Sequence, residues 1–171
     1  MNFDFSLFKI IHSLVGKSIY LDSLGIFFAQ YLIWLIPILI FLIWLFERKK
    51  LLKALFFGFL SAFLVYLFDF LFKKIYFRPR PFVSLNFQSL INISPKESSF
   101  PSTHTALAFC FAFSVYFINR RLGIILLILA FLIGLARIFT GVHWPSDILI
   151  GIVLAFFSSL IVNKIFTHKL N

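Results

Sequence analysis

The sequence predicts an all-α polytopic membrane helix bundle, with five transmembrane helices and an N-terminal amphipathic helix at the membrane interface. The chain has 171 residues, of which 61% are hydrophobic and 20% aromatic, and its mean hydropathy is +1.02. A soluble domain of this size does not need so much apolar surface. We expect residues 1–171 to form a single integral-membrane domain, because no linker or internal repeat divides the sequence.

The N-terminal segment has the pattern of an interfacial helix rather than that of a cleaved signal peptide. Apolar residues (Phe8, Ile11, Leu14, Val15) recur at helical spacing opposite polar ones (Asp4, Lys9, Ser13). This periodicity predicts a helix that lies in the plane of the interface. A signal peptide would begin with basic residues, whereas Asp4 stands there. We expect His12 to be an interfacial side chain without a catalytic role.

Five apolar runs approach or reach the length of about 20 residues that crosses a bilayer as a helix. The predicted spans are 24–46, 51–72, 105–118, 122–139 and 148–166. We expect Asp22 or Ser23 to cap the first span and Pro37 to kink it. The polar stretch 73–102 reads as a loop, because it is rich in Pro, Asn and Ser.

The distribution of basic residues predicts the orientation in the membrane. The loops after the first and third spans, and the C-terminal end, contain Arg48, Lys49, Lys50, Lys53, Arg120, Arg121, Lys164 and Lys169. Cytoplasmic segments are enriched in Lys and Arg, so loops 73–102 and 140–146 should face away from the cytoplasm. The net charge of +10 therefore serves topology and anionic headgroups, and we expect no nucleic-acid partner. The single cysteine, Cys110, excludes an internal disulfide.

Cations, histidines and a carboxylate stand where the hydrophobic runs begin or end. They form three blocks: Lys73 with Arg80-Pro81; Pro101-Ser102-Thr103-His104; and Arg137 with His143 and Asp147. Charged groups beside a bilayer are costly and mark a functional site by default. Each block has an ordinary alternative, namely a basic flank, a helix cap or a surface ion pair. Together they suggest a site that binds a phosphate group and attacks it.

The chemistry of each block fits phosphate. Lys and Arg suit phosphate oxygens, and a helix that begins at Ser102 offers free N–H groups to an anion. His104, in the first turn, could protonate a leaving oxygen. If Asp147 holds one ring nitrogen of His143, the other is free to attack phosphorus. Asp69 could position the ammonium group one helical turn away, or could simply need a cation partner.

The three blocks resemble the type 2 phosphatidic acid phosphatase superfamily, whose pattern is Lys-x6-Arg-Pro, Pro-Ser-Gly-His and Ser-Arg-x5-His-x3-Asp. The chain departs from it at Thr103, in place of Gly, and at Ala136, in place of Ser. Within the superfamily, the stretches 76–82 and 99–105 are similar to the bacitracin-resistance type of undecaprenyl diphosphate phosphatase. Neither departure removes a catalytic group.

This resemblance implies a role for each matched residue. His143 would be the nucleophile that forms a phosphohistidine, Asp147 would orient it, and His104 would protonate the leaving group and then activate water. The phosphoryl oxygens would be held by Lys73, Arg80, Ser102, Thr103 and Arg137. Three protein cations would take the place of Mg²⁺, so no metal and no cofactor are expected.

The implied function is hydrolysis of undecaprenyl diphosphate at the outer face of a bacterial plasma membrane, with no obligate protein partner. Lys74 and Arg78 would add charge suited to a diphosphate, and Phe70, Phe72, Phe77 and Phe82 would offer walls for the lipid chain. The alternatives are a phosphatidylglycerophosphate or phosphatidate phosphatase of the same superfamily, and a non-catalytic protein that binds anionic lipids.

Overall fold

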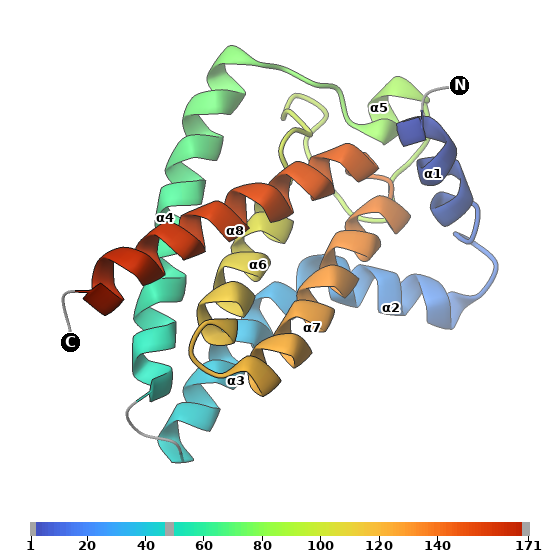
Figure 1. Cartoon of the computed structure of the whole chain (residues 1–171). Coiled ribbons are helices and arrows are strands. Elements are labelled where there is room, and N and C mark those ends of the chain that lie inside the picture. Colours follow the sequence, from blue (N-terminus) through green and yellow to red (C-terminus); the bar gives the residue numbers. More distant parts are fainter. Residues whose placement is uncertain (1–2, 47–49, 169–171) are drawn as a thin grey trace.

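The computed structural model describes residues 3–46 and 50–168, and within these ranges the chain is all-helical and contains no strand. The helices are α1 (Phe3–His12), α2 (Ile19–Gln30), α3 (Leu32–Phe46), α4 (Lys50–Ile75), α5 (Pro81–Ser84), α6 (Thr103–Tyr116), α7 (Arg120–Phe139) and α8 (Pro145–His168) (Figure 1). The all-α class predicted from the sequence is therefore confirmed. Three residues used to predict the orientation, Arg48, Lys49 and Lys169, lie outside the described ranges.

Helix α6 forms the centre of the bundle and packs against α4, α7 and α8. Small side chains allow this close packing, since Ala106, Ala108 and Ala112 on α6 are all buried. Cys110 is buried among them as a packing residue. Because neighbouring helices surround α6, most of its 14 residues are buried, and its apolar character serves the core of the bundle.

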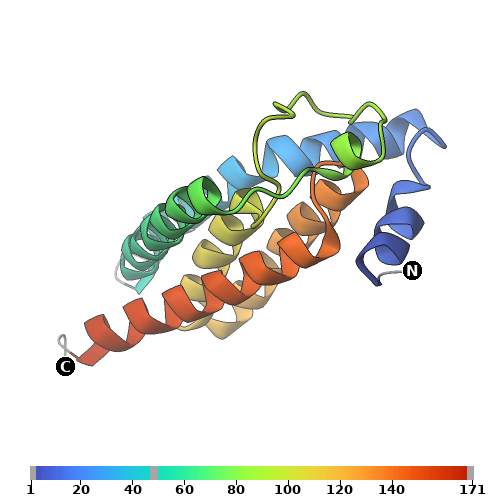
Figure 2. The same ribbon diagram turned by 90° about the horizontal axis from the view of Figure 1, so that it is seen from above.

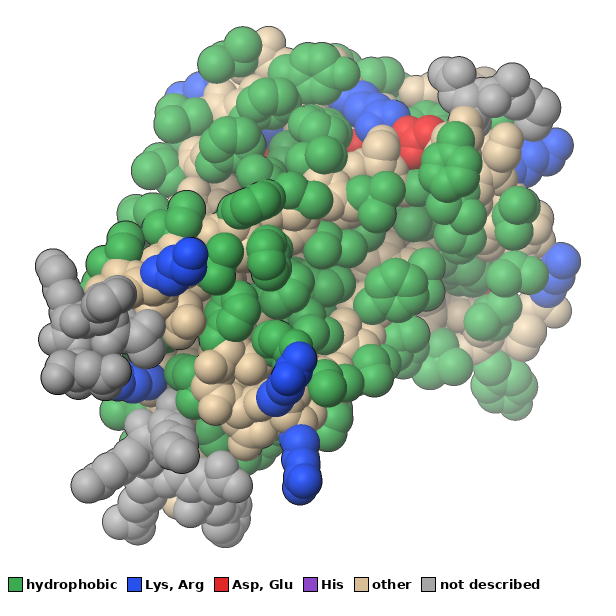
Figure 3. Space-filling model, viewed as in Figure 1, with side chains coloured by type: hydrophobic (Ala, Val, Ile, Leu, Met, Phe, Trp, Pro, Cys, Tyr) green, Lys and Arg blue, Asp and Glu red, His purple; other side chains and the backbone are tan. Residues whose placement is uncertain are grey.

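The outer helices expose apolar side chains, and Figure 3 shows hydrophobic groups over most of the visible surface, with few charges among them. Three helical stretches in the described ranges are long and apolar enough to cross a bilayer: Leu51–Ile75, Arg120–Phe139 and Pro145–Phe166. The pair Ile19–Gln30 and Leu32–Leu45 qualifies as a fourth span if it is taken together, whereas Thr103–Tyr116 is shorter. An apolar surface of this extent identifies an integral membrane protein.

The prediction of a first span kinked at Pro37 is wrong in its details. The chain bends by 63° at Tyr31, between α2 and α3, and Pro37 lies inside α3. The break allows α2 to pack on α7 while α3 packs on α4. Gly25 explains the close approach of α2, because a Cβ there would lie 2.5 Å from the Phe139 ring. Tertiary packing, rather than the missing N–H of proline, sets the position of the bend.

The start of α2 also differs from the prediction. Ser18 is the N-cap residue, and Asp22 lies inside the first turn. Both carboxylate oxygens of Asp22 accept from the backbone N–H of Gly16, at 3.1 and 3.2 Å. Gly16 has φ +78°, a conformation that glycine adopts without strain. Asp22 therefore stabilises the turn before the helix instead of capping the helix at its own position.

The connection from α4 to α6 runs over one end of the bundle and carries the short helix α5, and α1 lies at this same end (Figures 1 and 2). Helix α1 packs against α7 and α8. Phe8 on α1 is buried, and the centroid of its ring lies 5.2 Å from that of Trp144. The Nδ1 atom of His12 lies 2.8 Å from the carbonyl oxygen of Phe139, so His12 ties α1 to α7 rather than standing free at the interface.

Candidate active site

The three sequence blocks meet at one end of the bundle, where α4 and α7 end and α6 and α8 begin. One cavity of about 750 Å³ is lined by six of the eight predicted site residues, namely Lys73, Arg80, Thr103, His104, Arg137 and His143. Ser102 and Asp147 are fully buried behind this lining. The structure thus brings together residues that are up to 74 positions apart, from Lys73 to Asp147, around one hollow.

His143 lies at the base of this hollow with only 2% of its surface exposed. Its Nδ1 atom is 2.7 Å from the carbonyl oxygen of Ser99, so Nδ1 carries the proton and donates it. Its Nε2 atom is 3.3 Å from Nη1 of Arg80 and 3.3 Å from Nη2 of Arg137. Burial, and then the charges of Arg137 and Arg80, hold the pKa of His143 well below its usual value of 6.5. The ring is therefore neutral, with its Nε2 lone pair facing the cations.

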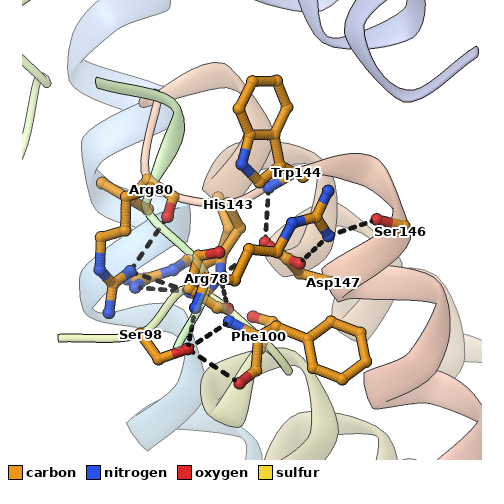
Figure 4. A network of polar contacts seen from close by, with 12 residues as sticks. Arg78, Arg80, Ser98, Phe100, His143, Trp144, Ser146 and Asp147 are labelled. Atoms are coloured by element: carbon orange, nitrogen blue, oxygen red, sulfur yellow. Dashed lines mark hydrogen bonds and ion pairs between the residues drawn. The ribbon is translucent and has the colours of Figure 1, made fainter. Parts of the chain in front are cut away.

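Asp147 lies beside Nδ1 of His143, as predicted, but is not hydrogen-bonded to it. The distance from its Oδ2 to Nδ1 of His143 is 3.6 Å, which is too long for a hydrogen bond. Oδ2 accepts instead from the backbone N–H of Trp144 at 2.8 Å, and Oδ1 accepts from Arg78 at 2.6 Å (Figure 4). The partner that fixes the tautomer of His143 is the backbone carbonyl of Ser99, for which the sequence carries no signal. Asp147 still lies close enough to stabilise a positive charge on the imidazole ring.

Two buried arginine side chains line the cavity. Arg80 donates from Nη1 to the carbonyl of Val142 at 3.0 Å, and Arg137 donates from Nη1 to the carbonyl of Ala29 at 3.2 Å. Within the described residues, the Nε atoms of both arginines have no hydrogen-bond partner. Burial lowers the pKa of Arg80, and the carboxylate of Glu97 opposes this effect. Two guanidinium groups that line one cavity are suited to binding an anionic ligand.

Asp69 does hold the ammonium group of Lys73. Their distance, from Nζ to Oδ2, is 3.0 Å. The hydroxyl of Thr103 accepts from Lys73 at 2.8 Å and donates to Asp69 at 2.6 Å. This hydroxyl is therefore engaged, and only the backbone N–H of Thr103 is left for an anion. Thr103, which stands where the superfamily pattern has Gly, therefore adds its hydroxyl group to the Lys73–Asp69 ion pair.

Ser102 occupies the N-cap position of α6, as predicted, but its side chain does not cap the helix. Its hydroxyl oxygen lies 3.0 Å from that of Thr105, and its backbone N–H donates to the carbonyl of Asp147 at 3.2 Å. Gly151 makes this approach of α8 possible, because a Cβ there would lie 3.1 Å from the carbonyl oxygen of Ser102. Ser102 thus joins the start of α6 to the start of α8.

The extra cations expected for a diphosphate are not in the cavity. Arg78 donates to Asp4 at 2.5 Å as well as to Asp147, and it borders a separate hollow of about 240 Å³. The ammonium group of Lys74 lies 4.2 Å from the centre of the Phe70 ring. The predicted contribution of Arg78 and Lys74 to phosphate binding is therefore wrong, because each side chain already has a partner elsewhere.

The apolar part of the cavity is formed by other side chains than the phenylalanines that the sequence suggested. Its walls come from α3, α4 and α6: Ile33, Trp34, Pro37, Phe59, Ala62, Phe63, Tyr66, Leu107 and Phe111. Phe70, Phe72, Phe77 and Phe82, which the sequence suggested as walls, do not line it. Glu97 lies at its rim, 64% exposed at the side chain, with Oε2 3.4 Å from Arg80. The cavity therefore joins a cationic end to an apolar groove between membrane helices.

A cationic pocket with two histidines that opens into an apolar groove, in a helical membrane bundle, is the site expected of a membrane lipid phosphatase. The comparisons with known proteins agree. The chain belongs to the PAP2 superfamily, whose model matches residues 50–170. It is 33% identical to undecaprenyl-diphosphatase BcrC of Bacillus subtilis over 152 residues. This matched region covers 89% of this chain and 78% of that protein.

Two solved structures share the fold. The crystal structure of Aquifex aeolicus LpxE matches with a TM-score of 0.73 at 27% identity, over 96% of both chains. The structure of a transmembrane PAP2 type phosphatidylglycerolphosphate phosphatase from Bacillus subtilis matches with a TM-score of 0.70 at 23% identity, over 100% of this chain and 89% of that one. The second of these likenesses bears on the fold alone.

Proposed function

We propose that this chain hydrolyses undecaprenyl diphosphate to undecaprenyl phosphate and inorganic phosphate through a phosphohistidine at His143. The observation that carries the proposal is the neutral Nε2 of His143, held 3.3 Å from each of two guanidinium groups at the end of a lipid-sized groove. The name of the Bacillus subtilis relative supports the choice of substrate. The conclusion that the chain is a membrane lipid phosphatase does not depend on that choice.

In the first step, Nε2 of His143 attacks the terminal phosphorus, an N–P bond forms, and the bond from phosphorus to the bridging oxygen breaks. His104, which lines the same cavity from the first turn of α6, gives a proton to the bridging oxygen. Arg80 and Arg137, which line the cavity, stabilise the charge that develops on the phosphoryl oxygens. Undecaprenyl phosphate is the leaving group.

In the second step, His104 takes a proton from water, the water oxygen attacks phosphorus, and the N–P bond breaks. Inorganic phosphate leaves, and His143 returns to its neutral form. The carbonyl of Ser99 keeps the Nδ1 proton in place throughout, at 2.7 Å. The carboxylate of Asp147, 3.6 Å from the same nitrogen, stabilises the positive ring while the intermediate exists.

The phosphoryl group is held by protein donors and needs no metal ion. Its ligands are the side chains of Lys73, Arg80 and Arg137, which line the cavity, together with the backbone N–H of Thr103. Within the described residues, no group of three or more His, Cys, Asp or Glu side chains is placed to hold a metal. Two guanidinium forks and an ammonium supply the charge that Mg²⁺ supplies in other phosphoryl transfer sites.

In the membrane, the chain is a single domain of residues 1–171 with five spans, the first of them broken at Tyr31 and the third formed by α6. Helix α1 lies in the interface, a position that its exposed apolar side chains, including Phe3 and Ile10, support. The basic residues Arg120 and Arg121 lie at the other end of α7 from the cavity. The active site therefore opens on the outer face of a bacterial plasma membrane.

A glycerolipid phosphate, phosphatidylglycerophosphate or phosphatidate, is the second candidate substrate. One observation favours it, because Arg78 and Lys74 are engaged elsewhere and, among the described residues, three cations line the cavity. Three cations are sufficient for a phosphate monoester, so charge does not select the diphosphate.

The test is phosphate release by the purified protein from undecaprenyl or farnesyl diphosphate, phosphatidate and phosphatidylglycerophosphate in one detergent. We expect the highest kcat/KM for the polyprenyl diphosphate. A glycerolipid phosphate that is preferred by about tenfold, or about 1.4 kcal/mol of transition-state stabilisation, would overturn the substrate and leave the phosphohistidine chemistry standing.

A further inference from the structure

We propose that Arg78 and Asp4 are positioning residues for the reaction. Both lie outside the cavity, and together they hold the two groups that face Nδ1 of His143, namely the carboxylate of Asp147 and the carbonyl of Ser99. The inference rests on the proposed function for the roles of His143 and Asp147. It assigns a part in the chemistry to the N-terminal helix, which carries Asp4.

The side chain of Arg78 bridges two carboxylates that come from opposite ends of the sequence. Nη1 donates to Oδ1 of Asp147 at 2.6 Å and to the hydroxyl of Ser146 at 2.7 Å (Figure 4). Nη2 donates to Oδ2 of Asp4 at 2.5 Å. Asp147 has no exposed side-chain surface. Its Oδ2 accepts from Trp144, so both of its oxygens have a fixed donor.

The backbone of Arg78 holds the second group. Its carbonyl accepts from the N–H of Ser99 at 2.8 Å, and the carbonyl of Ser99 accepts from Nδ1 of His143 at 2.7 Å. The N–H of Arg78 donates to the hydroxyl of Ser98 at 3.1 Å. One residue thus sets the position of both partners of the histidine, one through its guanidinium and the other through its peptide group.

Asp4 connects this arrangement to α1 and to the start of α8. Its Oδ1 accepts from the backbone N–H of Ser146 at 2.9 Å, and its Oδ2 accepts from the Ser146 hydroxyl at 2.8 Å. An acidic group at a helix N-terminus accepts hydrogen bonds from free N–H groups and interacts favourably with the positive end of the helix dipole. Asp4 therefore fixes both Arg78 and the first turn of α8, in which Asp147 lies.

The geometry separates a positioning role from a phosphate-binding one. A guanidinium can donate in two directions at once, which a lysine cannot reproduce with the same geometry. The guanidinium of Arg78 donates to Asp147 on one side and to Asp4 on the other. Arg78 does not line the cavity that holds His143. Loss of Arg78 should therefore slow the chemical step for every substrate and should not weaken the binding of a diphosphate in particular.

The experiment compares R78Q, R78K and D4N with wild type, using farnesyl diphosphate and phosphatidate as substrates for the purified full chain in detergent. R121Q is the matched control, because Arg121 is exposed at the start of α7 and takes no part in the site. A single-turnover measurement of phosphoenzyme formation gives the rate per folded molecule. Thermal unfolding identifies any variant that does not fold, and D4N and R78K then carry the test.

We expect R78Q and D4N to lower kcat and the phosphorylation rate by about tenfold to a hundredfold, the loss that a displacement of about 1 Å can cause. The factor should be alike for both substrates, KM should stay within about twofold, and R78K should retain more activity than R78Q. A kcat within twofold of wild type in folded R78Q and D4N would overturn the inference. So would a KM that rises for the diphosphate alone, since Arg78 would then be a phosphate ligand. The proposed function is tested separately with H143A. Phosphate release that survives in this variant would contradict the proposed function, whatever the result for R78Q and D4N.

Discussion

Replacement of Thr103 by Val removes one hydroxyl and keeps the shape of the side chain. That hydroxyl donates to Asp69 at 2.6 Å and accepts from Lys73 at 2.8 Å, in a position where the superfamily pattern has Gly. Asp69 is 4% exposed, and within the described residues its Oδ1 already lacks a partner. T103V therefore leaves a buried carboxylate with the ammonium of Lys73 alone, at 3.0 Å.

The size of the effect follows from these two hydrogen bonds. A hydrogen bond to a charged group contributes about 1.5–3 kcal/mol, and a buried acceptor left without a donor costs a similar amount. We expect T103V to lower the free energy of unfolding by about 2–3 kcal/mol. Because the Lys73–Asp69 pair survives, kcat/KM should fall by no more than about tenfold, or about 1.4 kcal/mol.

The assay is unfolding of the purified protein in detergent, together with kcat/KM for farnesyl diphosphate. T103S is the matched control, because it keeps the hydroxyl, and it should stay within about 0.5 kcal/mol of wild type. If T103V is as stable as T103S and equally active, the hydroxyl does not hold the Lys73–Asp69 pair, and our explanation of this departure from the superfamily pattern is wrong.

Three further predictions concern the chemistry and its location. Activity should survive excess EDTA and be inhibited by vanadate, because protein cations hold the phosphoryl group; loss with EDTA that Mg²⁺ restores would contradict this. In a C110A background, S84C should react with an impermeant thiol reagent on intact cells, since Ser84 is exposed beside the site; reaction only after permeabilisation would place the site inside. Because the pKa of His143 is held well below 6.5, the nucleophile stays neutral as the pH falls through 6.5, and the phosphorylation rate in single turnovers should not fall tenfold between pH 7 and pH 6.

The sequence was informative where residue type and spacing determine the structure. Apolar runs predicted the helices, since a bilayer requires about 20 such residues per span. The three blocks predicted which residues meet, because charges at the ends of spans collect at one face of a bundle. The start of α6 at Thr103 also agrees with the prediction.

The errors share a physical cause, which is that side-chain direction and backbone partners depend on the tertiary fold. Tyr31, rather than Pro37, marks the bend, because α2 packs mainly on α7 whereas α3 packs mainly on α4. Arg78 carries the same charge as Arg80, but a carboxylate on α1 and another on α8 draw it out of the cavity. Ser99 acts through its carbonyl oxygen, which every residue has, so its contact with His143 leaves no trace in the sequence.

The central claim is that Nε2 of His143 becomes covalently bound to phosphorus during turnover. The most direct measurement is rapid quenching of wild type, H143A and H104A with lipid diphosphate labelled at the terminal phosphorus, followed by detection of acid-labile label on the protein. We predict labelled wild type at early times, no label on folded H143A, and a peptide carrying phosphate at His143. Label on H143A, or phosphate release by H143A at a rate near that of wild type, would contradict the account.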